Sequence, residues 1–423
     1  MNYITEKRSN ELSNEPYELT YSDLKYMMSQ NDMDKQECKH VTESSYRGES
    51  YYANDGHPGN EKIDNFHMAM FKEILYRDAK TEGFMMEYPH GIIINQGQRN
   101  SYYRGENQIF EKSQPTLYRT LDRLSDMDKK VYMFVASMRV AEFQIFLNKL
   151  GIVRFWQENY GTVLYEPLAQ HYGIETKWLD ITSDFDVAMF FATCKWDSDI
   201  KKWRPLTKKD TEKNEDTKYG VIFHIPGWRA DEAKIWMGLL DDDYYICNNV
   251  ILPIGYQPFM RCHSQHGYGI CMEDPFPLQE DTSFEKLRFR HSEELSNYMY
   301  EKMEGGRKIY PQEGLNDFED IIEHIKHTTV FSKTAFEIAM NNTKVFLDEK
   351  EAKEALGKCI LFESPIVVLD NESAIKVSRQ RIRAFNRKCV GFSIEKNYGI
   401  KLMARWTYIP PTEDDKTGIL SDG

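Results

Sequence analysis

The chain has 423 residues, of which 41% are hydrophobic and 13% aromatic, so it is long and apolar enough to bury a core. No run approaches the roughly eighteen consecutive apolar residues of a membrane helix, and the first residues lack the apolar stretch of a secretory signal, so we expect a cytoplasmic protein without a membrane partner. The formal net charge of −13 argues against non-specific binding along a nucleic-acid backbone, although it leaves room for a local basic groove.

Polar residues dominate the first part of the chain. Residues 1–60 combine Asn, Ser, Glu, Asp and Lys with few aliphatic side chains. Such a composition buries too little apolar surface to offset the entropy lost on ordering. We therefore expect a largely mobile polar arm, whose tyrosines could dock on the main body or on a partner.

Two segments with helical spacing and one short strand follow the arm. Apolar residues recur at helical spacing from 61 to 80, and residues 92–94 are apolar enough to predict a strand. Residues 128–150 keep the helical period over a longer distance, with Gly151 as a plausible C-cap. We expect this long helix to be scaffold.

The middle of the chain mixes strands and helices without regular alternation. Residues 178–181 predict a strand, and the segment up to Phe191 predicts a helix with a buried face. A charged loop is expected over 195–218, and residues 219–226 predict a strand that proline ends. This order predicts an α+β fold with a mixed central sheet and flanking helices.

The last third of the chain predicts an end to this domain and an extension. Residues 285–289 predict a strand, and helices are expected over 292–303 and 315–327, which completes a domain over residues 61–327. In the extension, residues 328–423, a strand is expected over 359–369, and the basic residues 374–386 have no clear pattern.

An unusual set of motifs runs through this domain. It begins with Tyr103-Arg104-Gly105 and Leu117-Tyr118-Arg119, and its longest part is Leu168-Ala169-Gln170-His171-Tyr172-Gly173 with Trp178-Leu179-Asp180-Ile181-Thr182-Ser183 and Val187 to Phe191. Further matches are Pro258 to Arg261, Gln265, Gly267, Gly269 and Ile309-Tyr310-Pro311. In order and spacing these motifs, over residues 102–311, resemble the FRG domain family, which is named after its aromatic-Arg-Gly start.

The same arrangement is similar to mono-ADP-ribosyltransferases of the Arg-Ser-Glu type, which implies an ADP-ribosyltransferase-like core and NAD as substrate. In those enzymes an early Arg grips a phosphate of NAD, a Ser supports the nicotinamide ribose, and a Glu stabilises the transition state. The resemblance implies the first role for Arg104 and the second for Thr182 and Ser183. No Glu-x-Glu occupies the third place; Gln265 is the positional candidate with Glu273 behind it, and a glutamine cannot offset positive charge.

The resemblance therefore implies two sets of site residues. The candidate NAD-binding residues are Tyr103, Arg104, Gly105, Arg119, Gln170, Tyr172, Asp180, Thr182 and Arg261. The candidate catalytic residues are His171, Ser183, Gln265 and Glu273.

Each of these residues also has a structural interpretation. Arg104 can form an ion pair with Glu106 or Asp180 instead of binding phosphate. Ser183 can cap a helix, as can its neighbours Thr182 and Asp184. His171 and Gln170 can be buried groups that bond the backbone, and Asp180 can tie a loop together as well as bind ribose or orient His171.

Other chemistries have weaker signals in the sequence. The seven cysteines are scattered, which favours reduced thiols, and Cys262, His263, His266 and Cys271 lack the paired spacings of zinc sites, so no metal is expected. No Gly-x-Ser-x-Gly hydrolase motif or phosphate loop of the Walker kind occurs.

The densest basic run is Lys376, Arg379, Arg381, Arg383, Arg387 and Lys388. It can contact nucleic acid or nucleotide phosphate, or it can be a solvated face that pairs with acidic loops.

These observations lead to three functional hypotheses. The first is an FRG-domain protein that binds NAD and transfers ADP-ribose to a macromolecule, a chemistry that suits a toxin or an antiviral effector. The second is a non-catalytic module that recognises a nucleotide or a protein, and the third is nucleic-acid binding through the C-terminal basic run. Whether the chain is an enzyme, and its oligomeric state, are left open by the sequence.

Overall fold

The computed structural model describes residues 17–33, 84–88, 91–95, 101–159, 163–226, 251–254, 259–272, 277–281, 284–310, 314–390 and 407–408. The helix expected over 61–80 and the candidate residue Glu273 lie outside these ranges.

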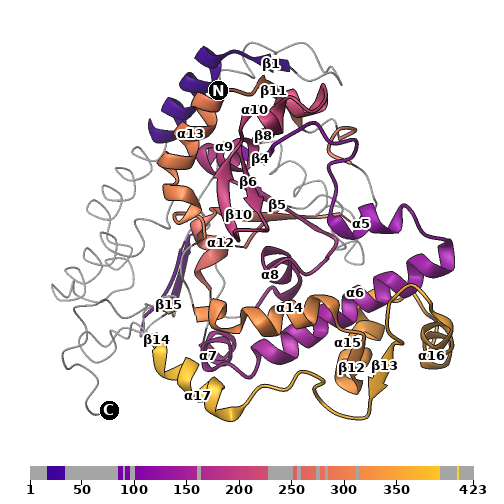
Figure 1. Cartoon of the computed structure of the whole chain (residues 1–423). Helices are drawn as coiled ribbons and strands as arrows, with labels where there is room; N and C mark the ends of the chain where they lie inside the picture. The colour runs from indigo at the N-terminus through magenta and orange to yellow at the C-terminus, as the bar shows by residue number, and fades with distance from the viewer. Residues whose placement is uncertain are drawn as a thin grey trace.

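A mixed seven-stranded sheet forms the centre of the fold (Figure 1). Its strand order is β1 (Tyr17–Leu19), β11 (Glu285–Arg290), β8 (Tyr219–Pro226), β4 (Ser101–Glu106), β5 (Trp178–Thr182), β10 (Gly267–Cys271) and β9 (Ile251–Pro253). The β1–β11 pair is parallel and the other pairs are antiparallel. The predicted α+β class with a mixed central sheet is thus confirmed.

Helices cover both faces of the sheet, because successive residues of its strands point to opposite sides. Tyr103 and Leu287 pack on one face against α9 (Phe185–Thr193), α13 (Glu293–Lys302) and the helix at 21–33. On the other face, Tyr102 and Phe223 pack against α5 (Thr116–Leu121) and α6 (Asp126–Leu147).

Residues 17–33 belong to this folded body. Strand β1 extends the sheet beside β11, and Leu24, Met27 and Met28 of the following helix are buried against α9 and α13. The composition had placed these residues in a polar arm, and the apolar face of this short helix is the signal that the averaged composition hides.

Helices surround the long α6 in the lower part of the molecule (Figure 1). A second core joins α6 to α7 (Gly151–Asn159), α8 (Tyr165–His171), α14 (Glu319–His327) and α17 (Arg379–Lys388). On another side of α6 lie α15 (Lys333–Thr343) and α16 (Glu349–Lys358), with the parallel pair β12 (Val330–Ser332) and β13 (Val367–Leu369).

Several short elements complete the description. They are the hairpin β2 (Phe84–Tyr88) and β3 (Gly91–Asn95), helix α12 (Met260–Ser264), the pair β14 (Cys389–Val390) and β15 (Thr407–Tyr408), and the 3-10 turns η3 (Asp216–Lys218), η5 (Glu304–Gly306) and η6 (Gly314–Phe318).

Three sequence predictions of secondary structure were wrong in part. Gly151 is not the C-cap of the long helix, because α6 ends with Asn148 as its C-cap and Gly151 begins α7. Of the strand expected over 359–369, only Val367–Leu369 pairs, because the preceding residues form bends at the surface. The loop expected over 195–218 contains a hairpin, β6 (Cys194–Asp197) with β7 (Lys202–Pro205), followed by α10 (Lys208–Thr211). Its charged residues hid the strands from a hydrophobicity pattern.

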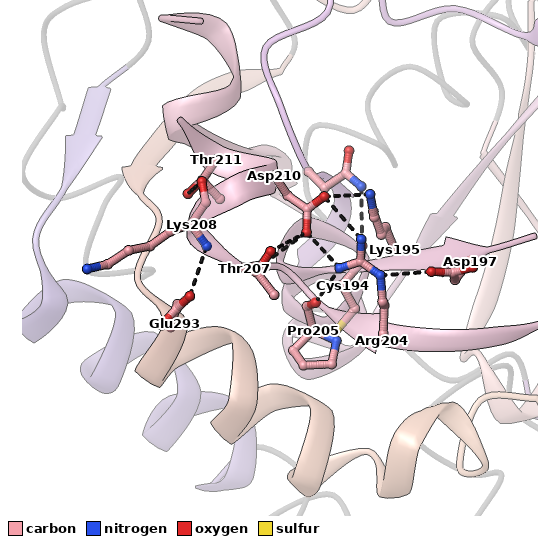
Figure 2. Close-up of polar contacts among 11 residues, drawn as sticks. Cys194, Lys195, Asp197, Arg204, Pro205, Thr207, Lys208, Asp210, Thr211 and Glu293 are labelled. Atoms are coloured by element: carbon pink, nitrogen blue, oxygen red, sulfur yellow. Dashed lines mark hydrogen bonds and ion pairs between the residues drawn. The ribbon is translucent and has the colours of Figure 1, made fainter. Parts of the chain in front are cut away.

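Those charges form an internal network that ties the hairpin to α10 (Figure 2). Arg204 Nη1 donates to Asp210 Oδ2 at 2.6 Å, and Arg204 Nε donates to Asp197 Oδ2 at 3.0 Å. Lys195 Nζ donates to Asp210 Oδ1 at 2.6 Å, and Asp210 closes a capping box with Thr207. Two cations and two carboxylates therefore neutralise one another between the hairpin and α10.

Candidate functional site

The site lies where β4 and β5 diverge. Strand β4 pairs with β8 from Ser101↔Pro226 to Glu106↔Val221, but it pairs with β5 only at Tyr103↔Thr182. Beyond that pair, the Nη1 of Arg104 donates to the backbone oxygen of Asp180 at 2.7 Å, which replaces a ladder bond by a side-chain bond. The gap between the strands leaves room for a cavity.

A cavity of about 340 Å³ opens there, near the lower end of the range of roughly 300–1,000 Å³ usual for small-molecule sites. Its described lining comes from β4, α8, β5, α9 and the two segments that carry Gln265 and Tyr310. The lining residues are Tyr103, Arg104, Gly105, Gln170, His171, Gly173, Asp180, Ile181, Thr182, Val187, Phe191, Gln265 and Tyr310.

Two hydrogen bonds fix the guanidinium of Arg104 in the lining of the cavity. In addition to its bond to Asp180, its Nε donates to Glu106 Oε1 at 2.9 Å, and Glu106 Oε2 accepts from Ser113 Oγ at 2.6 Å. The side chain of Arg104 keeps 23% of its surface exposed, whereas Glu106 is buried. The structural interpretation, an ion pair with Glu106, therefore holds, and it also fixes the guanidinium at the cavity.

Gly105 has a packing reason to be glycine. A Cβ at this position would lie 1.8 Å from the backbone oxygen of Ala188 in α9. Gly105 was predicted to bind NAD, but the close neighbour of its backbone is helix α9. This contact presses α9 against β4 and so positions Val187 and Phe191, two lining residues of that helix.

Three polar side chains of the lining lie close to one another. His171 Nδ1 lies 2.9 Å from Gln265 Oε1, and His171 Nε2 lies 3.4 Å from Asp180 Oδ1. Helix α8 ends at His171, and Gly173, with φ of +79°, turns the chain away. The positive φ explains why this position of the motif is a glycine.

The hydrogen bonds of Gln265 assign the proton on His171. Gln265 Nε2 donates to the backbone oxygen of Ile309 at 3.2 Å, so Oε1 must face His171 and accept. His171 Nδ1 then carries the hydrogen, and in the neutral ring Nε2 is an acceptor. Nε2 and Asp180 Oδ1 are both shielded from solvent, and neither has a hydrogen-bond partner within the described structure.

Thr182 and its neighbours form the turn between β5 and α9. Thr182 Oγ1 donates to the backbone oxygen of Gln265 at 2.8 Å and accepts from Asp184 N at 3.0 Å. The cap of α9 is Asp184, whose Oδ1 accepts from Asp186 N, so of the three predicted cap candidates it is Asp184 that caps. Ser183 is buried beside the cavity but does not line it, and its Oγ has no hydrogen-bond partner in the described part of the chain.

Tyr172 and Arg261 stand behind the wall and do not line the cavity. The guanidinium of Arg261 lies 4.2 Å from the ring centre of Tyr172 and 5.5 Å from that of Tyr310, and its Nη1 donates to the His171 backbone oxygen at 3.0 Å. Arg261 thus connects residues that form the wall, which is a positioning role.

Aromatic rings close another side of the cavity. Tyr310 stacks on Trp203 of the hairpin with ring centres 5.5 Å apart, and Phe191 lies edge-on to Trp203 at 5.6 Å. Burial raises the pKa of Tyr310 to about 12, so its hydroxyl is neutral near pH 7. The sequence interpretation did not assign Phe191 and Tyr310 to the site, although both lie in its motifs.

Two further candidates complete the predicted binding residues. Gln170 lines the cavity, and its Oε1 accepts from Thr176 Oγ1 at 2.9 Å. Arg119 is exposed on α5 and outside the lining, with Nη2 bonded to Thr116. Burial lowers the pKa of Arg119, and the nearby charge of Arg104 lowers it further, whereas Glu106 and Glu175 oppose this shift.

The C-terminal basic run forms α17 and has two faces. Phe385 is buried against Phe318, and Arg381 Nη1 donates to Asp320 at 2.8 Å. Arg379, Arg383 and Arg387 are exposed at helical spacing. One basic residue thus pairs internally, as the solvated-face interpretation expects, and three remain at the surface.

Two other kinds of feature are absent from the described ranges. No group of three or more His, Cys, Asp or Glu side chains there could hold a metal ion. Likewise, none of the helices in these ranges has the length and apolar character needed to cross a bilayer.

Comparison with known proteins assigns the family of this region. Residues 99–200 match the model of the FRG domain, so this part of the chain is an FRG domain, and the chain belongs with the FRG domain-containing proteins. No curated protein and no solved structure matches the chain. The matched region supplies Arg104, His171, Asp180 and Thr182, and the cavity adds Gln265 and Tyr310 from beyond it.

Proposed function

We propose that this cavity binds a nucleotide, with NAD as the substrate, and that the protein transfers ADP-ribose to a macromolecular acceptor. One observation carries the proposal: a fixed guanidinium and two unsatisfied buried acceptors line the same cavity. Arg104 suits a phosphate, because a guanidinium holds phosphate oxygens through several N–H donors.

The acceptors suit a ribose. Asp180 Oδ1 and His171 Nε2 each need a donor, and an unsatisfied buried acceptor costs about 1–3 kcal/mol. A ribose hydroxyl would supply the donor for Asp180 Oδ1, and the hydroxyl of the macromolecular acceptor would supply the donor for His171 Nε2. The volume of about 340 Å³ is sufficient for part of a dinucleotide, with the remainder reaching toward Arg119 at the surface.

Binding and activity are tested together with purified protein. Isothermal titration should show saturable NAD binding, which Arg104→Ala weakens about 10- to 100-fold because a charged hydrogen-bond donor is lost. Arg123→Ala, which removes an exposed Arg outside the cavity, is the matched control and should bind as the wild type does. Labelled NAD and a cell extract then report transfer or release of nicotinamide.

A non-catalytic recognition module is the second candidate. It is favoured by the amide of Gln265, whose two ends already bond His171 and Ile309, so this residue offers no carboxylate where a transferase has its Glu. NAD binding without any product would support the module. Absence of NAD binding would contradict the transferase and the module that recognises NAD, and would leave a protein-recognition module.

A further inference from the structure

We propose that Asp180 is the catalytic carboxylate of this cavity and that His171 Nε2 is the general base beside it; this inference rests on the proposed nucleotide site. The catalytic carboxylate would thus lie on β5, within residues 99–200 that match the FRG domain, and not at the position of Gln265.

The lining itself selects Asp180. Among the described residues that line the cavity, Asp180 is the only one with a carboxylate. Glu106 is adjacent but is buried behind Arg104 and Ser113. A carboxylate is needed because breaking the bond between ribose and nicotinamide develops positive charge on the ribosyl carbon, and a fixed negative group stabilises that charge.

The backbone and side chain of Asp180 have separate tasks. Its backbone oxygen accepts from Arg104, which fixes the strand, and its Oδ1 accepts no hydrogen bond within the described structure. Buried polar atoms without partners are uncommon and occur at functional sites. The side chain as a whole remains 33% exposed, which gives it access to the cavity.

His171 is oriented for proton transfer. Gln265 Oε1 accepts the Nδ1 hydrogen, Arg261 holds the backbone oxygen, and Nε2 is left 3.4 Å from Asp180. Gln265 thus fixes the ring, and Nε2 lies in the cavity beside the Asp180 carboxylate, where it can accept the proton of a hydroxyl. When the ring takes a proton, it becomes a cation next to the Asp180 carboxylate, which stabilises it.

The step balances without a further reactant beyond NAD and the acceptor. The bond between the ribosyl C1′ and the nicotinamide nitrogen breaks, and its electron pair neutralises the pyridinium. An acceptor hydroxyl, or water in hydrolysis, forms the new C1′–O bond and gives its proton to His171 Nε2. The ring later releases this proton to solvent.

The test separates turnover from binding. Asp180→Asn keeps the size of the side chain and the backbone oxygen that Arg104 needs, so it should bind NAD within about threefold of wild type while nicotinamide release falls about 100- to 1,000-fold. Asp199→Asn, an exposed carboxylate in the hairpin, is the matched control and should leave both unchanged. Circular dichroism checks that each variant folds.

A second variant tests the pairing of the two groups. His171→Gln should also slow release, and the double variant should be no slower than the slower single variant, because residues that act as a unit are not additive. Multiplicative effects of the two changes would contradict the pairing.

Each remaining outcome has a defined meaning. Turnover of Asp180→Asn near the wild-type rate would overturn the catalytic role, as would equal losses of binding and turnover, which would make Asp180 a binding residue only. Wild-type protein that binds NAD but forms no product would overturn this inference and leave the nucleotide site standing. Lack of NAD binding by the wild type would refute the proposed function and the catalytic role with it.

Discussion

Both ends of the Gln265 amide form hydrogen bonds inside the protein, so a carboxylate at this position would change the stability of the fold. Oε1 accepts from His171 and Nε2 donates to the Ile309 carbonyl. The residue is 6% exposed, so a lost bond is not replaced by water.

Gln265→Glu is therefore expected to destabilise the protein by about 1–3 kcal/mol, because a carboxylate oxygen would face the Ile309 carbonyl. Urea denaturation measures the free energy of unfolding. Gln380→Glu, an exposed change of the same kind on α17, should shift it by less than about 0.5 kcal/mol. If the Gln265→Glu protein is as stable as wild type and releases more nicotinamide from NAD, then a carboxylate at position 265 is favourable for catalysis.

The residues of the turn after β5 show a limit of motif-based prediction. Thr182, Ser183 and Asp184 can all cap a helix, and their sequence does not rank them. The structure ranks them because Thr182 Oγ1 is bonded to the backbone of Gln265, which leaves Asp184 in extended conformation at the helix start.

At the scale of elements, the carboxylate of Asp210 joins the hairpin β6–β7 to α10. Asp210 is bonded by Arg204, Lys195 and Thr207, and its side chain is 9% exposed (Figure 2). Burial alone would raise the pKa of Asp210, but the hydrogen bonds from Arg204 and Lys195 outweigh it and hold the pKa far below the ordinary value.

This shift predicts a pH-dependent contribution to stability. Because the folded pKa is depressed, the stabilisation is fully present above the unfolded pKa of about 3.9 and is lost as the pH falls toward the folded value. Asp210→Asn should therefore lower the free energy of unfolding by about 1–3 kcal/mol at pH 7, and the difference from wild type should shrink below about pH 4. Chemical denaturation at pH 7 and below about pH 4 measures the free energy of unfolding of both proteins. A difference between them that is constant with pH would contradict the depressed pKa of Asp210.

On the scale of the whole molecule, Asn31 joins the N-terminal segment to the domain. Its Nδ2 donates to Asp184 Oδ1 at 2.8 Å and to Asp186 Oδ2 at 3.2 Å, and its Oδ1 accepts from Phe185 N at 3.2 Å. These contacts surround the first turn of α9, the helix that lines the cavity.

Asn31→Ala should lower the free energy of unfolding by about 1–3 kcal/mol, because it removes buried partners of two carboxylates and of a helix N–H. Thermal unfolding followed by circular dichroism measures this loss. Ser29→Ala on the exposed side of the same helix should change little, within about 0.5 kcal/mol. Equal effects of the two changes would mean that Asn31 is a surface residue in solution.

The sequence predicted the local elements better than their long-range pairing. Helix α6 and strands β5 and β8 followed from apolar spacing. The parallel pairing of β1 with β11 did not, because it joins segments 270 residues apart and no local pattern encodes it. In the site, motifs identified Arg104 and Asp180, whereas the role of Tyr310 depends on how distant segments pack.

Strands β4 and β5 are joined by a single residue pair, so the sheet is less tightly paired there than between its other strands. Four strands, β1, β11, β8 and β4, form one half-sheet, and β5, β10 and β9 form the other, with one bridge at Tyr103↔Thr182. The bond from Arg104 to the backbone oxygen of Asp180 also spans this joint, and a molecule held by both side chains would add a second link across it. Slower amide hydrogen exchange along β5 and β10 on binding would then report occupancy of the cavity from inside the sheet.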